Sequence, residues 1–107
     1  MVVERFSVFL VQLDPIAGAE TGKTRPCLIV SPNEMNRALN TVIVAPMTTV
    51  KRGWPTRVAV LFQGKNGEIA LDQIRAVDKS RLIKKLGRID TITMETTLDR
   101  LGEIFAP

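Results

Sequence analysis

The chain contains no histidine among its 107 residues, and this absence removes several classes of site. Histidine is the commonest general base and the commonest zinc ligand, and Ser–His and Cys–His nucleophile pairs depend on it. Cysteine occurs once, at Cys27, which excludes a framework of internal disulfides. Carboxylates are scattered along the chain without forming a ligand cluster. We therefore expect neither a metal site nor a cofactor.

Long apolar runs are missing as well. No stretch approaches the roughly 20 apolar residues that span a bilayer, and residues 1–5 lead into a short apolar segment without the cleavage pattern of a signal peptide. We expect a cytoplasmic protein that does not enter a membrane. The hydrophobic content of 45% and the charged content of 24% are those of an ordinary globular protein. Residues 1–107 are therefore predicted to form one domain.

The charge is distributed unevenly along the chain. The net charge is +4, but residues 90–107 hold four carboxylates and one arginine, which leaves +7 on residues 1–89. A basic body with an acidic tail is typical of a protein that binds a polyanion on one surface. The alternative is that the lysines and arginines merely solvate the surface.

Short apolar and β-branched segments recur along the first 89 residues and predict a mainly β structure. Loops rich in glycine, proline or polar residues are expected at 14–24 and 47–55. An Asn-Gly pair predicts a hairpin turn at 64–67, and one helical turn is expected at 33–39. The expected strands are residues 6–13, 25–31, 41–45 and 56–62, followed by two strand pieces at 68–71 and 74–77 and a further short strand at 81–89.

The last segment has a different period. Apolar residues recur there at spacings of three and four, which predicts a helix over 94–105 with one apolar face. Thr93 is the expected N-cap, and Glu95 lies in the first turn near the positive end of the helix. The apolar residues are Leu98, Leu101, Ile104 and Phe105. Five or six short strands closed by one helix indicate a small, strongly bent antiparallel barrel.

Residues 18–26 form the first segment with candidate functional groups. The Gly22-Lys23-Thr24 triplet is similar to part of a nucleotide-binding P-loop, but the glycine required five residues before Gly22 is replaced by Ala17, and no helix follows. Arg25 carries a planar, permanently charged fork suited to a phosphodiester, and Pro26 restricts the backbone beside it. The alternative is a solvated loop with Arg25 lying along the rim of the barrel.

Two further segments carry polar and aromatic groups. Residues 46–55 place two hydroxyls at the end of a strand, then two cations and the only tryptophan, an arrangement suited to unstacked bases beside a phosphate backbone. Trp54 could instead seal the end of the barrel. In residues 71–78, Asp72 and Gln73 can recognise a base edge, whereas Arg75 and Asp78 are expected to form an ordinary ion pair. Cys27 is expected to be buried and unreactive.

These segments, in this order, resemble the MazF/PemK/Kid family of toxin endoribonucleases. The resemblance covers essentially the whole chain, and the ordered set of motifs is more specific than any one of them. The matching segments are VQLDP at 11–15, GAE at 18–20, KTRPCLIVSP at 23–32, VIVAPMT at 42–48, GWP at 53–55 and LDQIRAVD at 71–78.

The resemblance implies an SH3-like antiparallel barrel with a C-terminal helix, of the type shared by CcdB, MazF and Kid. It implies a homodimeric toxin of a type II toxin–antitoxin system that is inhibited by a cognate antitoxin with an acidic or disordered segment. It also implies an mRNA interferase that cuts single-stranded RNA, including messenger RNA, at short sequences without a metal. The products would carry a 2′,3′-cyclic phosphate and a 5′-hydroxyl.

The family's paired functional positions fall on Arg25 and Thr48, and its loop glutamate falls on Glu20. Arg25 is expected to stabilise charge on the phosphorus, Thr48 to orient the phosphate and Glu20 to act as the base. Some relatives carry histidine and arginine where this chain has Ala19 and Ala70, so mechanisms that use those groups cannot operate here. The expected RNA-binding residues are Lys23, Thr24, Pro26, Thr49, Lys51, Arg52, Trp54, Asp72 and Gln73.

Two other functions remain compatible with this sequence. A CcdB-like protein would inhibit DNA gyrase by protein contact on the same fold, because fold alone does not determine function. A catalytically weak RNA-binding module is a further alternative, suggested by Ala19 and Ala70. The KTRP segment at 23–26 and the PMT segment at 46–48 favour the endoribonuclease, because a gyrase inhibitor has no need of them.

Overall fold

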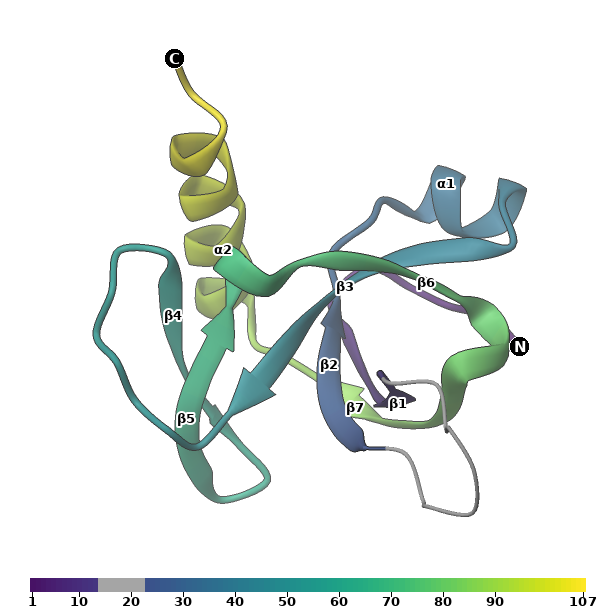
Figure 1. Cartoon of the computed structure of the whole chain (residues 1–107), viewed down its shortest axis with the longest axis horizontal. Coiled ribbons are helices and arrows are strands. Elements are labelled where there is room, and N and C mark those ends of the chain that lie inside the picture. Colours follow the sequence, from purple (N-terminus) through teal and green to yellow (C-terminus); the bar gives the residue numbers. More distant parts are fainter. Residues whose placement is uncertain (14–22) are drawn as a thin grey trace.

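A computed structural model of the chain describes residues 1–13 and 23–107 (Figure 1). The described part is mainly β with a C-terminal helix, as the sequence predicts. Its strands are β1 (Ser7–Gln12), β2 (Thr24–Ile29), β3 (Thr41–Thr48), β4 (Arg57–Phe62), β5 (Lys65–Ala70), β6 (Arg75–Asp78) and β7 (Leu82–Arg88). Its helices are α1 (Asn33–Ala38), α2 (Thr91–Ile104) and the short 3₁₀ turns η1 (Leu71–Gln73) and η2 (Lys79–Arg81).

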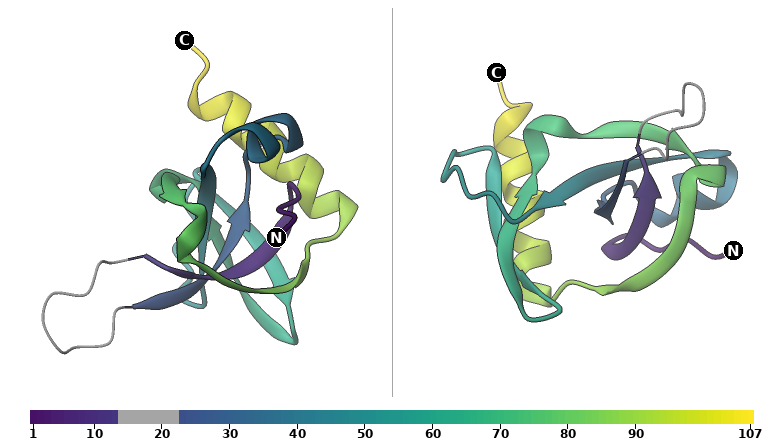
Figure 2. Two further views of the ribbon diagram at one scale, coloured as in Figure 1. Left: turned by 90° about the vertical axis from the view of Figure 1, so that its right-hand side faces the viewer. Right: turned by 60° about the horizontal axis from the view of Figure 1, so that its bottom comes forward.

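The strands form one antiparallel sheet that curls into a half-barrel, with the order β4-β5-β3-β2-β1-β7. The long strand β3 joins its two parts, because its first half pairs with β6 and its end pairs with β5. Figure 2 shows β6 and β7 passing around β1 and β2, while the β4–β5 hairpin lies beside α2. The bent antiparallel barrel expected from the sequence is confirmed, in a form whose two end strands, β4 and β7, are not paired with each other.

Two groups of buried side chains fill the two faces of this sheet. Alternation along β2 sends Leu28 to one group and Cys27 and Ile29 to the other. The first group lies under α2, whose Met94, Leu101 and Ile104 pack against it. The second group lies inside the curl of β1, β2, β3, β6 and β7. Arg25 and Thr48 stand at the ends of strands that these groups fix in place.

The start of α2 corrects the expected cap. The helix begins at Thr91, not at residue 94, and its N-cap is Asp90 instead of Thr93. The Asp90 carboxylate accepts a hydrogen bond of 2.7 Å from Thr93 N, and this bond lowers the pKa of Asp90. A carboxylate at the positive end of the helix also interacts favourably with the helix dipole.

The β4–β5 turn corrects the second expectation. Phe62 pairs with Lys65, so the turn is Gln63-Gly64, where both residues have positive φ, and the Asn-Gly pair lies inside β5. Gly67 instead permits a close approach between strands, because a Cβ built there would lie 2.3 Å from the carbonyl oxygen of Thr48. The glycine expected to make a turn therefore allows β5 to pack against the end of β3.

Candidate active site

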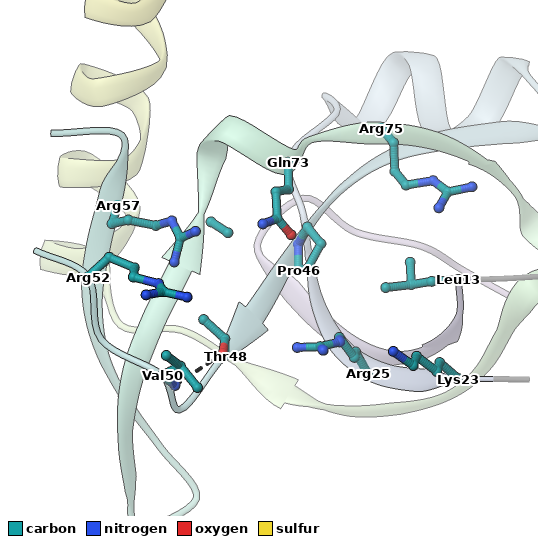
Figure 3. A pocket seen from close by; sticks show the side chains of 11 residues that line it. Leu13, Lys23, Arg25, Pro46, Thr48, Val50, Arg52, Arg57, Gln73 and Arg75 are labelled. Carbon is teal, nitrogen blue, oxygen red and sulfur yellow. Dashed lines mark hydrogen bonds between the residues drawn. The ribbon is translucent and has the colours of Figure 1, made fainter. Parts of the chain in front are cut away.

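A cleft of about 480 Å³ opens between the start of β2, the end of β3 and the start of β4 (Figure 3). None of the described residues that line it is a carboxylate, whereas five are cationic. Phosphate groups are favoured in such a cleft because no negative charge on its wall opposes them. The lining residues are Leu13, Lys23, Arg25, Pro46, Thr48, Val50, Arg52, Arg57, Ala70, Gln73 and Arg75.

Arg25 and Thr48 come together in this cleft from neighbouring strands. The antiparallel β2–β3 ladder ends with the pair Cys27 and Pro46, and Arg25 and Thr48 each lie two residues beyond this pair on the two strands. In Figure 3 the Arg25 side chain points toward Thr48. The Thr48 hydroxyl accepts a hydrogen bond of 3.1 Å from Val50 N, which leaves its proton available to a phosphate oxygen. The structure thus brings together the two residues expected to act on the phosphate.

A second cleft of about 480 Å³ adjoins the first and shares Arg25, Thr48 and Val50 with it. Its wall is less polar and includes Phe62 and Met47, with Lys65 as a cation besides the shared Arg25. Pro26 and Thr49, two of the expected RNA-binding residues, line this second cleft. Arg25 and Thr48 therefore form a ridge between two cavities.

The other expected RNA-binding residues lie at different places. Lys23, Arg52 and Gln73 line the first cleft, and Figure 3 shows the Gln73 side chain directed toward Pro46. Thr24, Lys51 and Trp54 are exposed but line neither cleft. Trp54 is 49% exposed, so it does not seal the end of the barrel. Glu20, the expected base, lies outside the residues that the structure describes.

Asp72 has a structural partner that its sequence context does not reveal. Its Oδ1 accepts hydrogen bonds of 2.7 Å from Arg57 Nε and 3.0 Å from Thr56 Oγ1, and its Oδ2 accepts one of 3.4 Å from Arg57 Nη2. The Arg57 guanidinium holds the pKa of Asp72 below its usual value. Both oxygens of this expected base-recognising residue are therefore engaged by protein donors, which leaves Gln73 as the polar group of the pair that faces the cleft.

Arg57 and Arg75 are cleft residues that the sequence analysis does not identify as functional. Arg57 is buried and lies between two carboxylates, Asp72 and Glu68. The sequence signal for this role of Arg57 is an arginine at the start of a strand rich in β-branched residues. If such an arginine is buried, it requires carboxylate partners. Arg75 lines the cleft instead of pairing with Asp78, whose carboxylate accepts a hydrogen bond from Ser80 N.

The described residues offer few groups for cysteine or metal chemistry. Burial raises the pKa of the Cys27 thiol to about 12, so at neutral pH this side chain is a protonated packing group, as expected. Among residues 1–13 and 23–107, no group of three or more Cys, Asp or Glu residues could hold a metal ion. In the same part of the chain, no helix is long and apolar enough to cross a membrane.

Comparisons with known proteins identify the family of this chain. Residues 4–105 match the family described as "PemK-like, MazF-like toxin of type II toxin-antitoxin system". Endoribonuclease EndoA of Bacillus subtilis (strain 168) is 35% identical over 101 residues, covering 89% of this chain and 87% of that protein. Endoribonuclease PemK of Escherichia coli is 38% identical over 108 residues, covering 95% of this chain and 81% of that protein.

Solved structures share the fold over nearly the whole chain. A mycobacterial endoribonuclease in complex with its cognate antitoxin superimposes with a TM-score of 0.83 at 29% identity, covering 98% of this chain and 97% of that one. MazF from a MazE–MazF complex of Deinococcus radiodurans gives a TM-score of 0.83 at 25% identity, covering 97% and 96%. On these matches the chain belongs to the PemK/MazF family of type II toxin–antitoxin toxins, whose curated relatives are endoribonucleases.

Proposed function

We propose that this chain, acting as one domain over residues 1–107, is a metal-independent, sequence-specific endoribonuclease of single-stranded RNA. The observation that carries this proposal is the convergence of Arg25 and Thr48 in a cleft whose described lining has five cations and no carboxylate. The products are a 2′,3′-cyclic phosphate and a 5′-hydroxyl. The cellular target is messenger RNA in the cytoplasm.

The reaction begins when a ribose 2′-oxygen attacks the adjacent phosphorus and loses its proton to a base. The bond from phosphorus to the 5′-oxygen then breaks, and a proton is delivered to that oxygen. Arg25 stabilises the negative charge that accumulates on the phosphoryl oxygens, which is usually the largest contribution to such a rate enhancement. Thr48 donates a hydrogen bond from its hydroxyl to a phosphoryl oxygen and fixes the orientation of the phosphate.

Glu20 is the proposed base. Two carboxylates that the structure describes beside the first cleft are unsuited to this role: Asp72 is engaged by Arg57, and Glu68 accepts backbone hydrogen bonds from Arg52 and Gly53 that lower its pKa. A carboxylate with a lowered pKa is a weak base at neutral pH. A positioned base contributes about 10²–10⁴-fold, so an enzyme without histidine still cleaves, at a lower rate.

The ridge formed by Arg25 and Thr48 supports a path for the RNA across both clefts. The scissile phosphate lies on the ridge, and the nucleotides on its two sides occupy one cleft each. Lys23, Thr24, Lys51 and Arg52 bind the backbone, Trp54 stacks on a base and Gln73 recognises a base edge. Pro26 and Thr49 complete the wall of the second cleft, and Asp72 lies beside the first. Because phosphate contacts dominate, the affinity falls steeply as the salt concentration rises.

The partners follow from the charge of the same surface. A cognate antitoxin with an acidic or disordered segment inhibits the enzyme by occupying the cationic cleft. The catalytic unit is a homodimer. An antitoxin that bound only elsewhere and left RNA access open would contradict this mode of inhibition.

The decisive experiment incubates the protein with a long single-stranded RNA in EDTA and maps the 5′ ends of the products. Discrete cuts are expected with the unmodified chain and none with Arg25→Ala or Thr48→Ala, while circular dichroism shows that both variants remain folded. Full activity in either variant would overturn the assignment of its residue. If the unmodified chain made no cut in two different long RNAs, the endoribonuclease proposal would fail, and a gyrase supercoiling assay would then test the CcdB-like alternative.

A further inference from the structure

Arg57 is the most deeply buried cation among the residues that the structure describes, at 7% exposed. It is the first residue of β4 and pairs directly with Ala70 of β5. Ala70 has a small side chain, so the Arg57 guanidinium has room to extend over the start of η1 and the end of β5. In Figure 3 it enters the cleft from the side opposite Arg25.

The two carboxylates that Arg57 contacts come from different elements. On one side its Nε and Nη2 bind the two oxygens of Asp72 in η1, the turn that also carries Gln73. On the other side its Nη1 lies 3.5 Å from Glu68 Oε1 in β5. A planar guanidinium can satisfy two carboxylates at once, whereas a lysine ammonium acts as a point charge.

Glu68 extends this network into the loop between β3 and β4. Its Oε1 accepts a hydrogen bond of 2.8 Å from Arg52 N, and its Oε2 accepts one of 3.0 Å from Gly53 N. Trp54 follows directly in the chain, and its ring lies 4.8 Å from the Arg57 guanidinium and 5.7 Å from that of Arg52. One buried arginine thereby connects η1 to the loop that carries Arg52 and Trp54.

Arg57 also has an electrostatic role, because it neutralises the two carboxylates that it contacts. Without it, Asp72 and the 6% exposed Glu68 would stand unpaired beside a cleft that binds a polyanion. Unpaired carboxylates at that place would repel RNA phosphates. Glu68, whose oxygens hold the loop, would also lose its positively charged partner. Arg75, Arg25 and Lys23 lie in the same cleft but make no ion pair with these two carboxylates in the described structure.

We propose that Arg57 is a positioning residue for RNA binding: by joining Asp72 to Glu68 it fixes Arg52 in the wall of the cleft and Trp54 beside it, and it neutralises two carboxylates there. It acts through these residues and does not touch the reacting atoms. The proposal rests on the endoribonuclease function proposed above. It assigns Arg57 to substrate affinity, and Arg25 and Thr48 to the chemical step.

The test uses the only tryptophan, Trp54, as a reporter that requires no RNA. Arg57→Lys keeps the charge but loses the two-sided fork, and we expect quenching of Trp54 fluorescence by acrylamide to rise about 1.5-fold. For cleavage of an RNA that contains a mapped site, we expect KM to rise about tenfold with kcat changed by less than about twofold. The matched control is Arg88→Lys, because Arg88 forms an exposed ion pair with Glu4 away from the cleft. It should change neither readout.

A second variant tests the direction of the connection. Glu68→Gln retains the size of the side chain but places an amide donor against one of the backbone N–H groups of residues 52 and 53, so it should reproduce both effects of Arg57→Lys. The Arg57→Lys/Glu68→Gln double variant should show less than the sum of the two single effects, because both act through one network.

Two outcomes would overturn the proposal. One is unchanged Trp54 quenching in both folded single variants, and the other is a loss confined to kcat. If the unmodified chain failed to cleave any RNA while Trp54 quenching still rose in the variants, the positioning of the loop would be correct and the proposed function would be wrong. The two failures are therefore distinguishable.

Discussion

The two sides of the first cleft use the same residue type in opposite ways. On the β2 side, Arg25 is exposed, and no described carboxylate lies within ion-pair distance of it. On the β4 side, Arg57 is buried, and both edges of its fork are occupied by carboxylates. One guanidinium is available to a substrate, and the other is already committed to the protein.

This difference teaches that burial decides which arginine takes which role. A buried charge without partners is strongly unfavourable, so Arg57 exists in the core only together with Asp72 and Glu68. An exposed guanidinium gives up only water when it binds a phosphate, and it leaves no carboxylate unpaired. Arg25 is consequently suited to charge that develops during a reaction, and Arg57 to fixed geometry.

Replacing Arg25 with lysine should give the largest effect, and it should fall on activity alone. The positive charge remains but the planar fork is lost, so we expect kcat to fall about hundredfold, the range found when one transition-state donor is removed. The free energy of unfolding should change by less than about 0.5 kcal/mol, as is usual for exposed positions without special contacts. Single-turnover cleavage and urea denaturation measure the two quantities.

The same substitution at Arg57 provides the contrast. Arg57→Lys should lower the free energy of unfolding and raise KM, whereas Arg25→Lys should lower kcat. If both variants lost the same parameter to the same extent, the division between a committed and an available arginine would be wrong.

A methyl group at Gly67 should give an intermediate effect on both activity and stability. The added Cβ would lie 2.3 Å from Thr48 O and 3.2 Å from Thr48 C, and backbone atoms cannot move aside as a flexible side chain can. Gly67→Ala should therefore displace Thr48, lower the free energy of unfolding by about 1–3 kcal/mol and reduce cleavage about tenfold. Denaturation and initial cleavage rates test this.

Gly102→Ala is the matched control for that variant. Gly102 lies in α2 with nothing within 4 Å of an added Cβ, so alanine should stabilise the helix by about 0.5–1 kcal/mol without affecting cleavage. Equal stability changes in the two glycine variants would contradict the close packing of β5 against β3.

Sequence patterns predicted the strands well because β-branched segments and their proline or glycine boundaries are local signals. They failed where a local signal has two physical meanings. Asn66-Gly67 is a turn signal, but Gly67 serves a contact with Thr48, which is 19 positions away in the chain. Thr93 and Asp90 are both good caps, and only the helical geometry selects Asp90.

The candidate site shows the same limit. Arg25 and Thr48 were predicted because their segments match a family motif, and the structure places them in one cleft. Arg57 in β4 interacts with Glu68 in β5 and Asp72 in η1, which lie well beyond it along the chain, and no spacing rule indicates this interaction. Asp72 consequently looks available in the sequence but is engaged in the structure.

Acidification should give the smallest of the three effects. It should distinguish the two sides of the cleft, because the carboxylates beside it with lowered pKa values lie on the β4 side. The pKa of Asp72 is lowered by Arg57, and that of Glu68 by the backbone N–H groups of Arg52 and Gly53. A carboxylate whose pKa is lowered on folding adds stability above its unfolded value of about 4, and loses it as the pH falls through the lower folded value. The urea midpoint should thus stay level from pH 7 to about 5 and decline below about pH 4.

Asp78 and Asp90 also have lowered pKa values and contribute to this decline. The double variant Asp72→Asn/Glu68→Gln should therefore reduce the decline without removing it, while Arg25→Lys should leave it unchanged. Identical pH dependence in the double variant and the unmodified chain would show that the β4 side contributes no linked protons.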